Sequence, residues 1–196
     1  FDIFKNSKEN VFLGGNVGNS YSENVLNELE NGENSIHILE ISSYQAEHLY
    51  NFNPKISCIL NISEDHMDRY SSMNDYVNAK LNIAKNLSKK TKLIYNGDDK
   101  ILSEKLQPAN NIIPFSINDK NSLVEWSNDL EDCLRFKNQS HKFKNPLIGI
   151  HNFYNILAAT IIADLYGIKS KNIKDSIINF NALPHRTECL QLYKGV

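Results

Sequence analysis

Short apolar runs rich in β-branched residues alternate with segments of helical periodicity through the first half of the chain. Each run is nearly continuous in apolar character, as strands buried on both faces should be. Because strands that alternate with helices form parallel sheets, the pattern predicts an α/β fold with a mostly parallel sheet flanked by helices. The predicted strands are Val11–Leu13, Ile36–Glu40, Ile56–Asn61 and Lys92–Tyr95, and the predicted helices are Ser22–Glu30, Ser43–Leu49 and Met73–Leu87.

The pattern changes between Ile112 and Lys144, where brief strand-like pieces are separated by clusters of Asn, Asp and Ser. These pieces, IIPFS, LVEW and CLRFK, predict a small antiparallel excursion from the main sheet. A long helix is then expected from about Asn152 to Tyr166, with Gly167 at its C-cap, followed by a second helix from about Lys171 to Asn179.

Composition narrows the class of protein. With 196 residues, 41% hydrophobic and 22% charged, the chain suits one globular domain, and a net charge of -2 does not predict a nucleic-acid partner. Cys58, Cys133 and Cys189 form no CxxC pair, which favours reduced thiols in the cytosol. No run approaches the ~20 apolar residues that cross a bilayer, and the segment FDIFKNSKEN lacks the basic and apolar blocks of a signal peptide, so we expect a cytoplasmic protein without a membrane partner. Because Phe1 is not Met, we also expect a piece of a longer chain.

Glu40 ends one of the predicted strands, and Ser42, Ser43 and Gln45 follow directly. In open parallel sheets, ligands bind beyond the carboxyl ends of the strands. A carboxylate at that place would suit Mg²⁺, which prefers hard oxygen ligands. The alternative is that Ser42 or Ser43 caps a helix and that Glu40 is only solvated.

A second polar cluster follows the next predicted strand, in the run ISCILNISEDHMDRY. It contains Asp65, His66, Asp68 and Arg69, and groups of this kind gather at catalytic sites. The alternative is a solvated turn or a local pair between Asp and Arg. Because this strand comes next after the strand of Glu40, the two strand ends are expected to meet.

Lys80 lies within an apolar stripe of the helix expected at residues 73–87. Most such lysines extend their amine to solvent from the edge of the stripe. A buried lysine with a lowered pKa, in contrast, has a neutral amine that can act as a nucleophile or take up CO₂ as a carbamate. The residues of the stripe are Met73, Tyr76, Val77, Leu81, Ala84 and Leu87.

Three weaker signals are each open to two interpretations. The turn GGNVG, which contains Asn16, follows a strand but lacks the GxxxxGK[ST] pattern of a P-loop, so a plain tight turn explains it. Asn152 and Asn155 share one face at a helix start, a position that favours anions, although Asn there is more often a cap. Arg186, in the segment LPHRTE, suits phosphate recognition, although surface arginines are common.

Taken in order, seven segments resemble the central domain of the Mur ligases, from about Leu13 to Glu188. They are GGNVG, LEISSYQAE, LNISEDHMDRY, AKLNIAKN, NGDD, GIHNFYNILAA and LPHRTE. The set is specific because each weak signal falls in the order and spacing of the family. Within the family, the Glu-x-Ser-Ser-aromatic-Gln segment is similar to that of the members that add D-glutamate to UDP-N-acetylmuramoyl-L-alanine.

The resemblance implies an ATP-dependent ligase of peptidoglycan precursor synthesis. ATP would phosphorylate the substrate carboxylate, and the amine of D-glutamate would then attack the acyl phosphate, a reaction that depends mainly on positioning and electrostatics. The implied catalytic residues are Lys80 and His66. The implied Mg²⁺ ligands are Glu40, His66 and a carbamylated Lys80. The implied substrate contacts are Asn16, Ser42 and Gln45, and the implied ATP contacts are Asn152, Asn155 and Arg186.

The chain also departs from the family pattern. The P-loop of the family precedes the glycine turn, and none of the 13 residues before Gly14 resembles it. We therefore expect residues 1–196 to be an incomplete central domain, monomeric and inactive alone, without the N-terminal uridine-nucleotide domain and the C-terminal amino-acid domain. Folylpolyglutamate synthase, a non-catalytic nucleotide- or partner-binding domain, and a metal-binding module around His66 remain alternatives. A structural zinc site would need further Cys or His at short spacing, which the sequence lacks.

Overall fold

Five strands pair in parallel, in two sheets, in the computed structural model of the chain. β1 (Val11–Gly15) pairs with β2 (Ile36–Glu40), and β3 (Ile56–Ile59), β4 (Lys92–Asn96) and β5 (Ile112–Phe115) form the second sheet in that order. The predicted parallel α/β architecture is confirmed. The structure describes residues 1–118, 124–127, 132–136, 139–143, 147 and 149–181.

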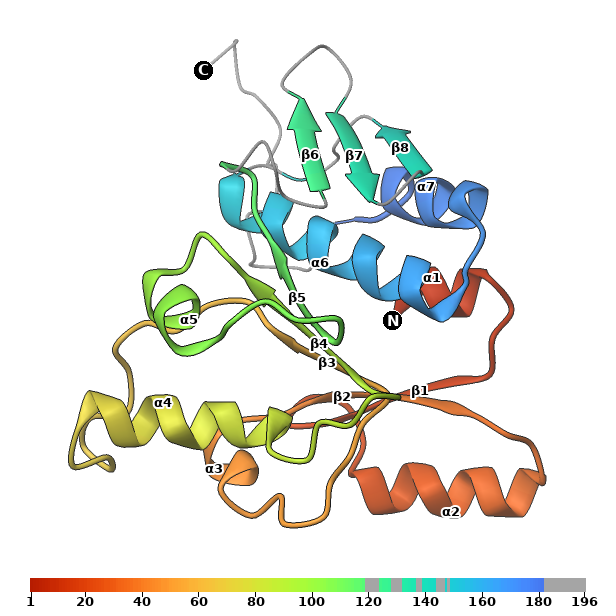
Figure 1. Cartoon of the computed structure of the whole chain (residues 1–196). Helices are drawn as coiled ribbons and strands as arrows, with labels where there is room; N and C mark the ends of the chain where they lie inside the picture. Colours follow the sequence, from red (N-terminus) through yellow and green to blue (C-terminus); the bar gives the residue numbers. More distant parts are fainter. Residues whose placement is uncertain (119–123, 128–131, 137–138, 144–146, 148, 182–196) are drawn as a thin grey trace, which may run out of the picture.

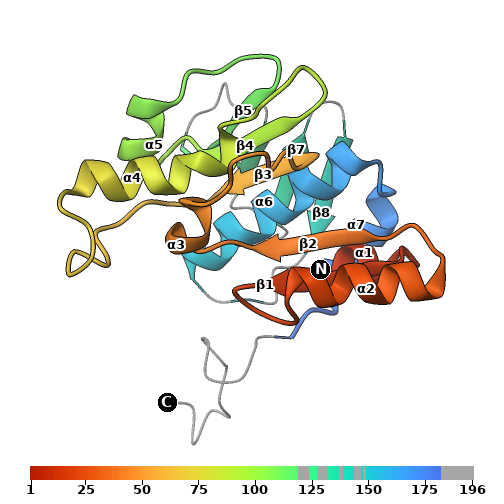
Figure 2. The same cartoon turned by 90° about the horizontal axis from the view of Figure 1, so that it is seen from below.

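Helices cover both faces of these sheets, as Figure 1 and Figure 2 show. One side carries α2, α3 and α4, and the opposite side carries α6 together with α1 and α7. The helices are α1 (Asp2–Asn6), α2 (Tyr21–Asn31), α3 (Ser43–Ala46), α4 (Met73–Leu81), α5 (Lys100–Lys105), α6 (Ile150–Tyr166) and α7 (Ser170–Ile178), and a 3₁₀ turn, η1 (Asn82–Ala84), extends α4.

The strand β4 divides the core into two clusters. Side chains of a strand point alternately to its two faces. Ile94 packs in the cluster of α6, which contains the fully buried Leu157 and Ile161. Leu93 and Tyr95 pack in the second cluster, with residues of α4 and α5. Both clusters are therefore built on one central strand.

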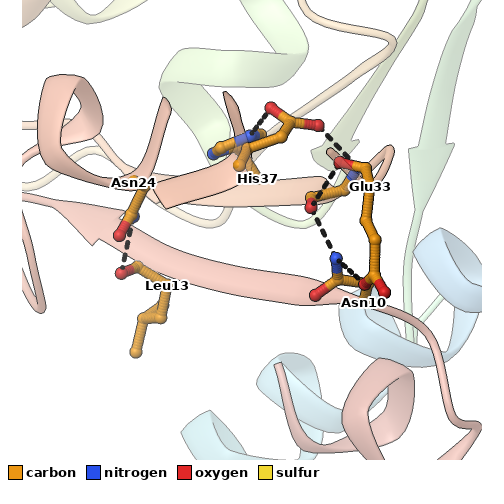
Figure 3. A network of polar contacts seen from close by, with 7 residues as sticks. Asn10, Leu13, Asn24, Glu33 and His37 are labelled. Carbon is orange, nitrogen blue, oxygen red and sulfur yellow. Dashed lines mark hydrogen bonds and ion pairs between the residues drawn. The ribbon is translucent and has the colours of Figure 1, made fainter. Parts of the chain in front are cut away.

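A polar network fastens α2 to the amino ends of β1 and β2 (Figure 3). Glu28 accepts the backbone N–H of Ser35 at 2.6 Å and lies 2.8 Å from Nε2 of His37. The side chain of Asn10 bonds to both Glu33 and Ser35. These residues precede or begin the strands, so the network lies at the sheet edge opposite Glu40.

The inward face of α2 carries a polar residue. Asn24 is 1% exposed, and its Nδ2 donates to the Leu13 carbonyl at 3.1 Å. Leu26 and Leu29 of the same helix are 59% and 72% exposed. The buried residue of α2 therefore holds this helix to β1 by a hydrogen bond.

The prediction for the segment IIPFS was wrong. It was expected in the antiparallel excursion, whereas Ile112–Phe115 is β5 of the parallel sheet. Pro114 has no N–H to donate, and β5 is an edge strand, where a proline is tolerated. Ile113 and Phe115 are buried in the α6 cluster, which explains the strand's position. Farther along, β6 (Val124–Ser127), β7 (Asp132–Phe136) and β8 (Gln139–Phe143) pair antiparallel.

The helix boundaries differ from the predictions in several places. The helix expected at residues 43–49 ends at Ala46, and the helix expected at 73–87 ends at Leu81 before the 3₁₀ turn. The short helices α1 and α5 were not predicted, because five or six residues carry little periodicity. The predicted end of α6 is confirmed: Gly167 has φ 99° and its N–H bonds to the Ala163 carbonyl.

Within the described residues, no helix combines the length and the apolar character that a bilayer crossing requires. Cys58 on β3 is a free thiol. Burial raises the pKa of Cys58 to about 12, so this thiol is not poised for reaction. Cys189 lies outside the described residues.

Candidate functional site

The turn after β1 holds Asn16 against Glu40. Gly15 lies opposite Glu40 at the carboxyl ends of the two strands. Its φ is 100°, and a Cβ there would overlap the Glu40 carbonyl oxygen, so glycine is needed for this close approach. Asn16 donates its backbone N–H to that oxygen at 2.8 Å, and its Nδ2 lies 3.3 and 3.4 Å from the two carboxylate oxygens. The tight turn thus places an amide beside an exposed carboxylate.

Ser42 and Gln45 form a capping box at the start of α3. The Ser42 hydroxyl accepts the Gln45 backbone N–H at 3.2 Å, and the Gln45 side-chain oxygen accepts the Ser42 backbone N–H at 2.9 Å. The capping alternative therefore describes Ser42, while Ser43 is buried within the first turn. Both capping residues stay close to Glu40 in sequence, and their contact with substrate remains a prediction.

His66 is at the corner of a tight turn after β3. Its φ of 58° is uncommon for a residue other than glycine, and such positions cluster at functional sites. The backbone N–H groups of Arg69 and Tyr70 donate to its carbonyl oxygen at 3.0 and 3.1 Å. Asp65 accepts the backbone N–H of His66, and its other carboxylate oxygen lies 3.5 Å from Nε2 of the ring. The turn therefore fixes the half-exposed imidazole.

Tyrosine rings connect His66 to Lys80. The His66 ring centroid lies 5.0 Å from that of Tyr44 and 6.1 Å from that of Tyr76. The Lys80 Nζ lies 5.1 Å from the centroid of the Tyr76 ring. Tyr76 is 3% exposed, and Tyr70 packs between it and Tyr44. The sequence showed Tyr76 only as a member of an apolar stripe, so its place between the two candidate residues was missed.

Arg69 does not pair with the neighbouring aspartates, as the local alternative supposed. Its Nη2 lies 2.9 Å from Oε2 of Glu47, just after α3, and its guanidinium lies 4.7 Å from the Tyr44 ring centroid. The Tyr70 hydroxyl donates to the other oxygen of Glu47 at 2.6 Å. Hydrogen bonds from Tyr70 and Arg69 hold the pKa of Glu47 below its ordinary value. The segments that follow β2 and β3 therefore meet, through α3.

The donor groups fit one kind of magnesium site. Among the described residues, no three His, Cys, Asp or Glu side chains form a ready cage, and no hydrogen bond or ion pair joins Glu40 to His66 or Lys80. Magnesium in phosphate-transferring sites is commonly held by one or two carboxylates, water and substrate phosphate. The exposed carboxylate of Glu40 fits that arrangement. An ammonium group is no metal ligand, and Mg²⁺ prefers oxygen donors, so a carbamate is the form of Lys80 that would suit this metal.

The start of α6 carries Asn152 and Asn155. The N-cap is Gly149, whose carbonyl accepts the Asn152 backbone N–H at 3.1 Å. Neither asparagine therefore caps the helix, which removes the structural alternative considered for them. Asn155 is exposed and Asn152 is half-buried, one turn apart on the same helix. Arg186 lies outside the described residues, so its role remains a prediction.

Asp98, after β4, bonds to two other elements. It accepts hydrogen bonds from the Ser116 hydroxyl at 2.5 Å, the Ile117 backbone N–H at 2.8 Å and the Tyr154 hydroxyl at 2.8 Å. Burial opposes ionisation of Asp98, yet these hydrogen bonds together hold its pKa below the ordinary value. Burial, and then the bond to Asp98, raises the pKa of Tyr154 to about 12.

Asp99 bonds in a different direction. Its Oδ1 accepts the Leu102 backbone N–H at 2.9 Å and caps α5, while its Oδ2 accepts the Ile62 backbone N–H at 2.9 Å. Ile62 lies between the end of β3 and His66. The sequence presented NGDD only as a segment of resemblance. Two adjacent carboxylates at a strand end were the signal that could have revealed these contacts.

Comparison with known proteins agrees with this arrangement. The sequence profile described as Mur ligase middle domain matches residues 3–163. A relative from Bacteroides fragilis, named UDP-N-acetylmuramoylalanine–D-glutamate ligase, is 32% identical over 204 residues, which cover 100% of this chain and 45% of the relative. A Clostridioides difficile protein of the same name is 35% identical, covering 95% of this chain and 42% of the relative. The chain thus spans less than half the length of these relatives.

Solved structures share the fold at low identity. The structure of UDP-N-acetylmuramoyl-L-alanyl-D-glutamate–2,6-diaminopimelate ligase matches 98% of this chain and 45% of its own, with a TM-score of 0.78 and 20% identity. The MurF ligase of Thermotoga maritima in complex with ADP matches 97% of this chain and 46% of its own, with a TM-score of 0.67 and 18% identity. On the profile match over residues 3–163, the chain belongs to the Mur ligase family, with the family's middle domain in that region.

Proposed function

We propose that this chain is the nucleotide- and magnesium-binding middle part of an ATP-dependent ligase that adds D-glutamate to UDP-N-acetylmuramoyl-L-alanine, in the cytoplasm. The observation that carries the proposal is the junction of α3 with the His66 turn. There Glu47 bonds to Arg69 and Tyr70, which joins the segment after β2 to the segment after β3. The candidate residues Glu40 and His66 belong to these two segments. The names of the two relatives support D-glutamate as the incoming amino acid.

The chemistry has two steps. The substrate carboxylate attacks the γ-phosphorus of ATP, giving an acyl phosphate and ADP, and the amine of D-glutamate then displaces phosphate to form the amide. Magnesium, when bound by Glu40 with phosphate oxygens and water, would neutralise phosphate charge. Asn16 orients the Glu40 carboxylate through its two weak amide contacts. Most of the protein's contribution is positioning, as in other phosphoryl transfers.

Lys80 and His66, which both lie beside Tyr76, are proposed to act together. The buried Tyr76 ring lies against the Lys80 amine and covers it on one side. The carbamate would restore a negative charge and two oxygens to a position where the free lysine has a positive charge. The fixed turn of His66 holds its imidazole at the same ring.

The start of α6 is proposed as the nucleotide side. Asn152 and Asn155 lie in its first two turns, at the end of the helix where the dipole favours an anion. Arg186 would add a bidentate phosphate contact. Asn16, Ser42 and Gln45 are proposed to contact the uridine-linked substrate, and the protein is proposed to act as a monomer.

The test is an ATP- and Mg²⁺-dependent phosphate-release assay on the parent-length protein. With UDP-N-acetylmuramoyl-L-alanine present, D-glutamate should support release, and L-lysine and L-alanine should not. Equal release with all three amino acids would exclude the D-glutamate assignment. A complete lack of release, with tight ADP binding retained, would favour a nucleotide-binding domain without ligase activity.

A further inference from the structure

The turn NGDD, residues Asn96 to Asp99, is held rigidly at the end of β4. The Asn96 side-chain oxygen accepts the backbone N–H of Asp98 at 3.0 Å, and Asn96 is 7% exposed. Gly97 donates its N–H to the Phe115 carbonyl at 2.7 Å, which ties the turn to the end of β5. The two aspartate side chains therefore project from a fixed backbone.

Asp98 connects this turn to α6. Its Oδ2 receives both the Tyr154 hydroxyl and the Ile117 N–H, so one oxygen joins the helix to the segment after β5. Tyr154 lies between Asn152 and Asn155 in sequence. A displacement of Tyr154 would move the backbone that carries both asparagines.

Asp99 connects the same turn to the segment after β3. Its bond to the Ile62 backbone N–H holds the chain four residues before His66. Ile62 is 5% exposed and packs in the cluster of α4, so this bond lies at the edge of the core. The second oxygen of Asp99 caps α5 and is already in use.

We infer that the Asn96–Asp99 turn is a positioning element that sets the distance between the two halves of the site. Asp98 positions the nucleotide side through Tyr154, and Asp99 positions the His66 side through Ile62. Adjacent residues of one rigid turn hold both sides, so neither side can shift without straining the turn. This inference rests on the proposed function for the roles of the two sides, but its geometry does not.

Two variants separate the two connections. Tyr154→Phe removes one hydroxyl and keeps the ring, while Asp99→Ser keeps a helix cap for α5 and cannot reach Ile62. Tyr95→Phe is the matched control, because its buried hydroxyl donates to the Leu106 carbonyl at 3.4 Å, away from Asp98. All three proteins should be made at parent length.

In steady-state assays the two test variants should change different kinetic constants. Tyr154→Phe should raise the KM for ATP several-fold, because the start of α6 is no longer held by Asp98, with a smaller change in kcat. Asp99→Ser should raise the Mg²⁺ concentration needed for half-maximal rate and lower kcat, with the KM for ATP nearly unchanged. Tyr95→Phe should change neither constant. If both test variants changed the same constants by the same factors, or resembled Tyr95→Phe, the inference would be wrong.

Backbone amide hydrogen exchange tests the geometry without measuring enzymatic activity. Tyr154→Phe should speed exchange in the first turns of α6 and leave residues 62–70 unchanged, and Asp99→Ser should do the reverse. This result would support the positioning element even if the wild-type protein released no phosphate, an outcome that counts against the proposed function alone. Equal acceleration in both segments, or in neither, would overturn the inference.

Discussion

The Glu47 carboxylate and the Arg69 guanidinium form an ion pair across two loops, with 2.9 Å between Oε2 and Nη2. Tyr70 donates to the same carboxylate, so one side chain fastens the segment after β2 to the segment after β3. Arg69 is about half exposed to solvent, and ion pairs at such positions contribute little to stability. The pair therefore matters for the relative placement of Glu40 and His66 more than for the stability of the fold.

Replacing Glu47 by glutamine should separate these two effects. Glu47→Gln removes the charge and leaves one acceptor for two donors, so the His66 turn should loosen. We expect a several-fold lower rate at limiting Mg²⁺ with a melting temperature close to that of the wild type, measured by phosphate release and calorimetry. Glu104→Gln, on the exposed face of α5, is the control. An unchanged rate would show that the pair does not place His66.

Lys80→Ala should abolish phosphate release at parent length, because the proposed carbamate oxygens disappear with the side chain. Partial rescue by a short carboxylic acid should follow, since the acid supplies oxygens at the same position. Lys85→Ala, an exposed lysine five residues later, should retain full activity. Full activity of Lys80→Ala would remove the carbamate hypothesis.

Gly15→Ala should destabilise the protein by more than Gly32→Ala. Both glycines have positive φ, 100° and 65°, but only at Gly15 would a Cβ meet backbone atoms of Glu40. The conformational cost alone is about 1 kcal/mol and is expected at Gly32. Gly15→Ala adds the overlap and should cost about 3 kcal/mol or more, measured by urea unfolding. Equal costs would mean that the close approach of β1 and β2 is easily relaxed.

Acidification should weaken the contribution of Asp98 to the free energy of unfolding. Its pKa is held below the ordinary value of 3.8 in the folded protein. A carboxyl with a depressed folded pKa stabilises above its unfolded pKa, and this stability is lost as pH falls through the folded value. The advantage of the wild type over Asp98→Asn in free energy of unfolding should thus be full at pH 7 and shrink below about pH 4. A difference that stayed constant with pH would contradict this linkage.

On α2, the buried side chain of Asn24 should contribute more to the free energy of unfolding than the exposed side chain of Leu29. Asn24→Ala leaves the Leu13 carbonyl without its buried donor and should cost about 2 kcal/mol in free energy of unfolding. Leu29→Ala, at a position 72% exposed, should change stability by less than about 0.5 kcal/mol. Urea denaturation of both variants checks the order. The reverse order would mean that another surface covers Leu29 in solution.

Local sequence patterns predicted the buried strands well, because nearly continuous apolar runs leave few alternatives to a parallel sheet. The C-cap glycine of α6 is equally local, since Gly167 follows the last apolar turn. β5 was expected in the antiparallel excursion because it is the first of three brief strand-like pieces, whereas it pairs in parallel with β4 at the edge of the sheet. The place of a strand in a sheet depends on all the other strands, so a short stretch of sequence does not reveal it.

The side-chain partners at the site were harder to predict for the same reason. A local pair between Arg69 and an aspartate was one alternative for its cluster, but its partner Glu47 is 22 residues away in sequence. Tyr154 and Asp98 are 56 residues apart, and their contact depends on how α6 crosses the sheet. The candidates Asn16, Glu40 and His66 stand at or just after strand ends and can be found by position. Their partners depend on tertiary packing.

The central strand β4 contributes Leu93 and Tyr95 to one cluster and Ile94 to the other. Cavities made on opposite sides of it share few neighbours, and effects of mutations that share no partners usually add. The core beneath α4 can therefore be repacked without retuning the core beneath α6. The two faces of β4 behave, for packing, as two separate interiors of one domain.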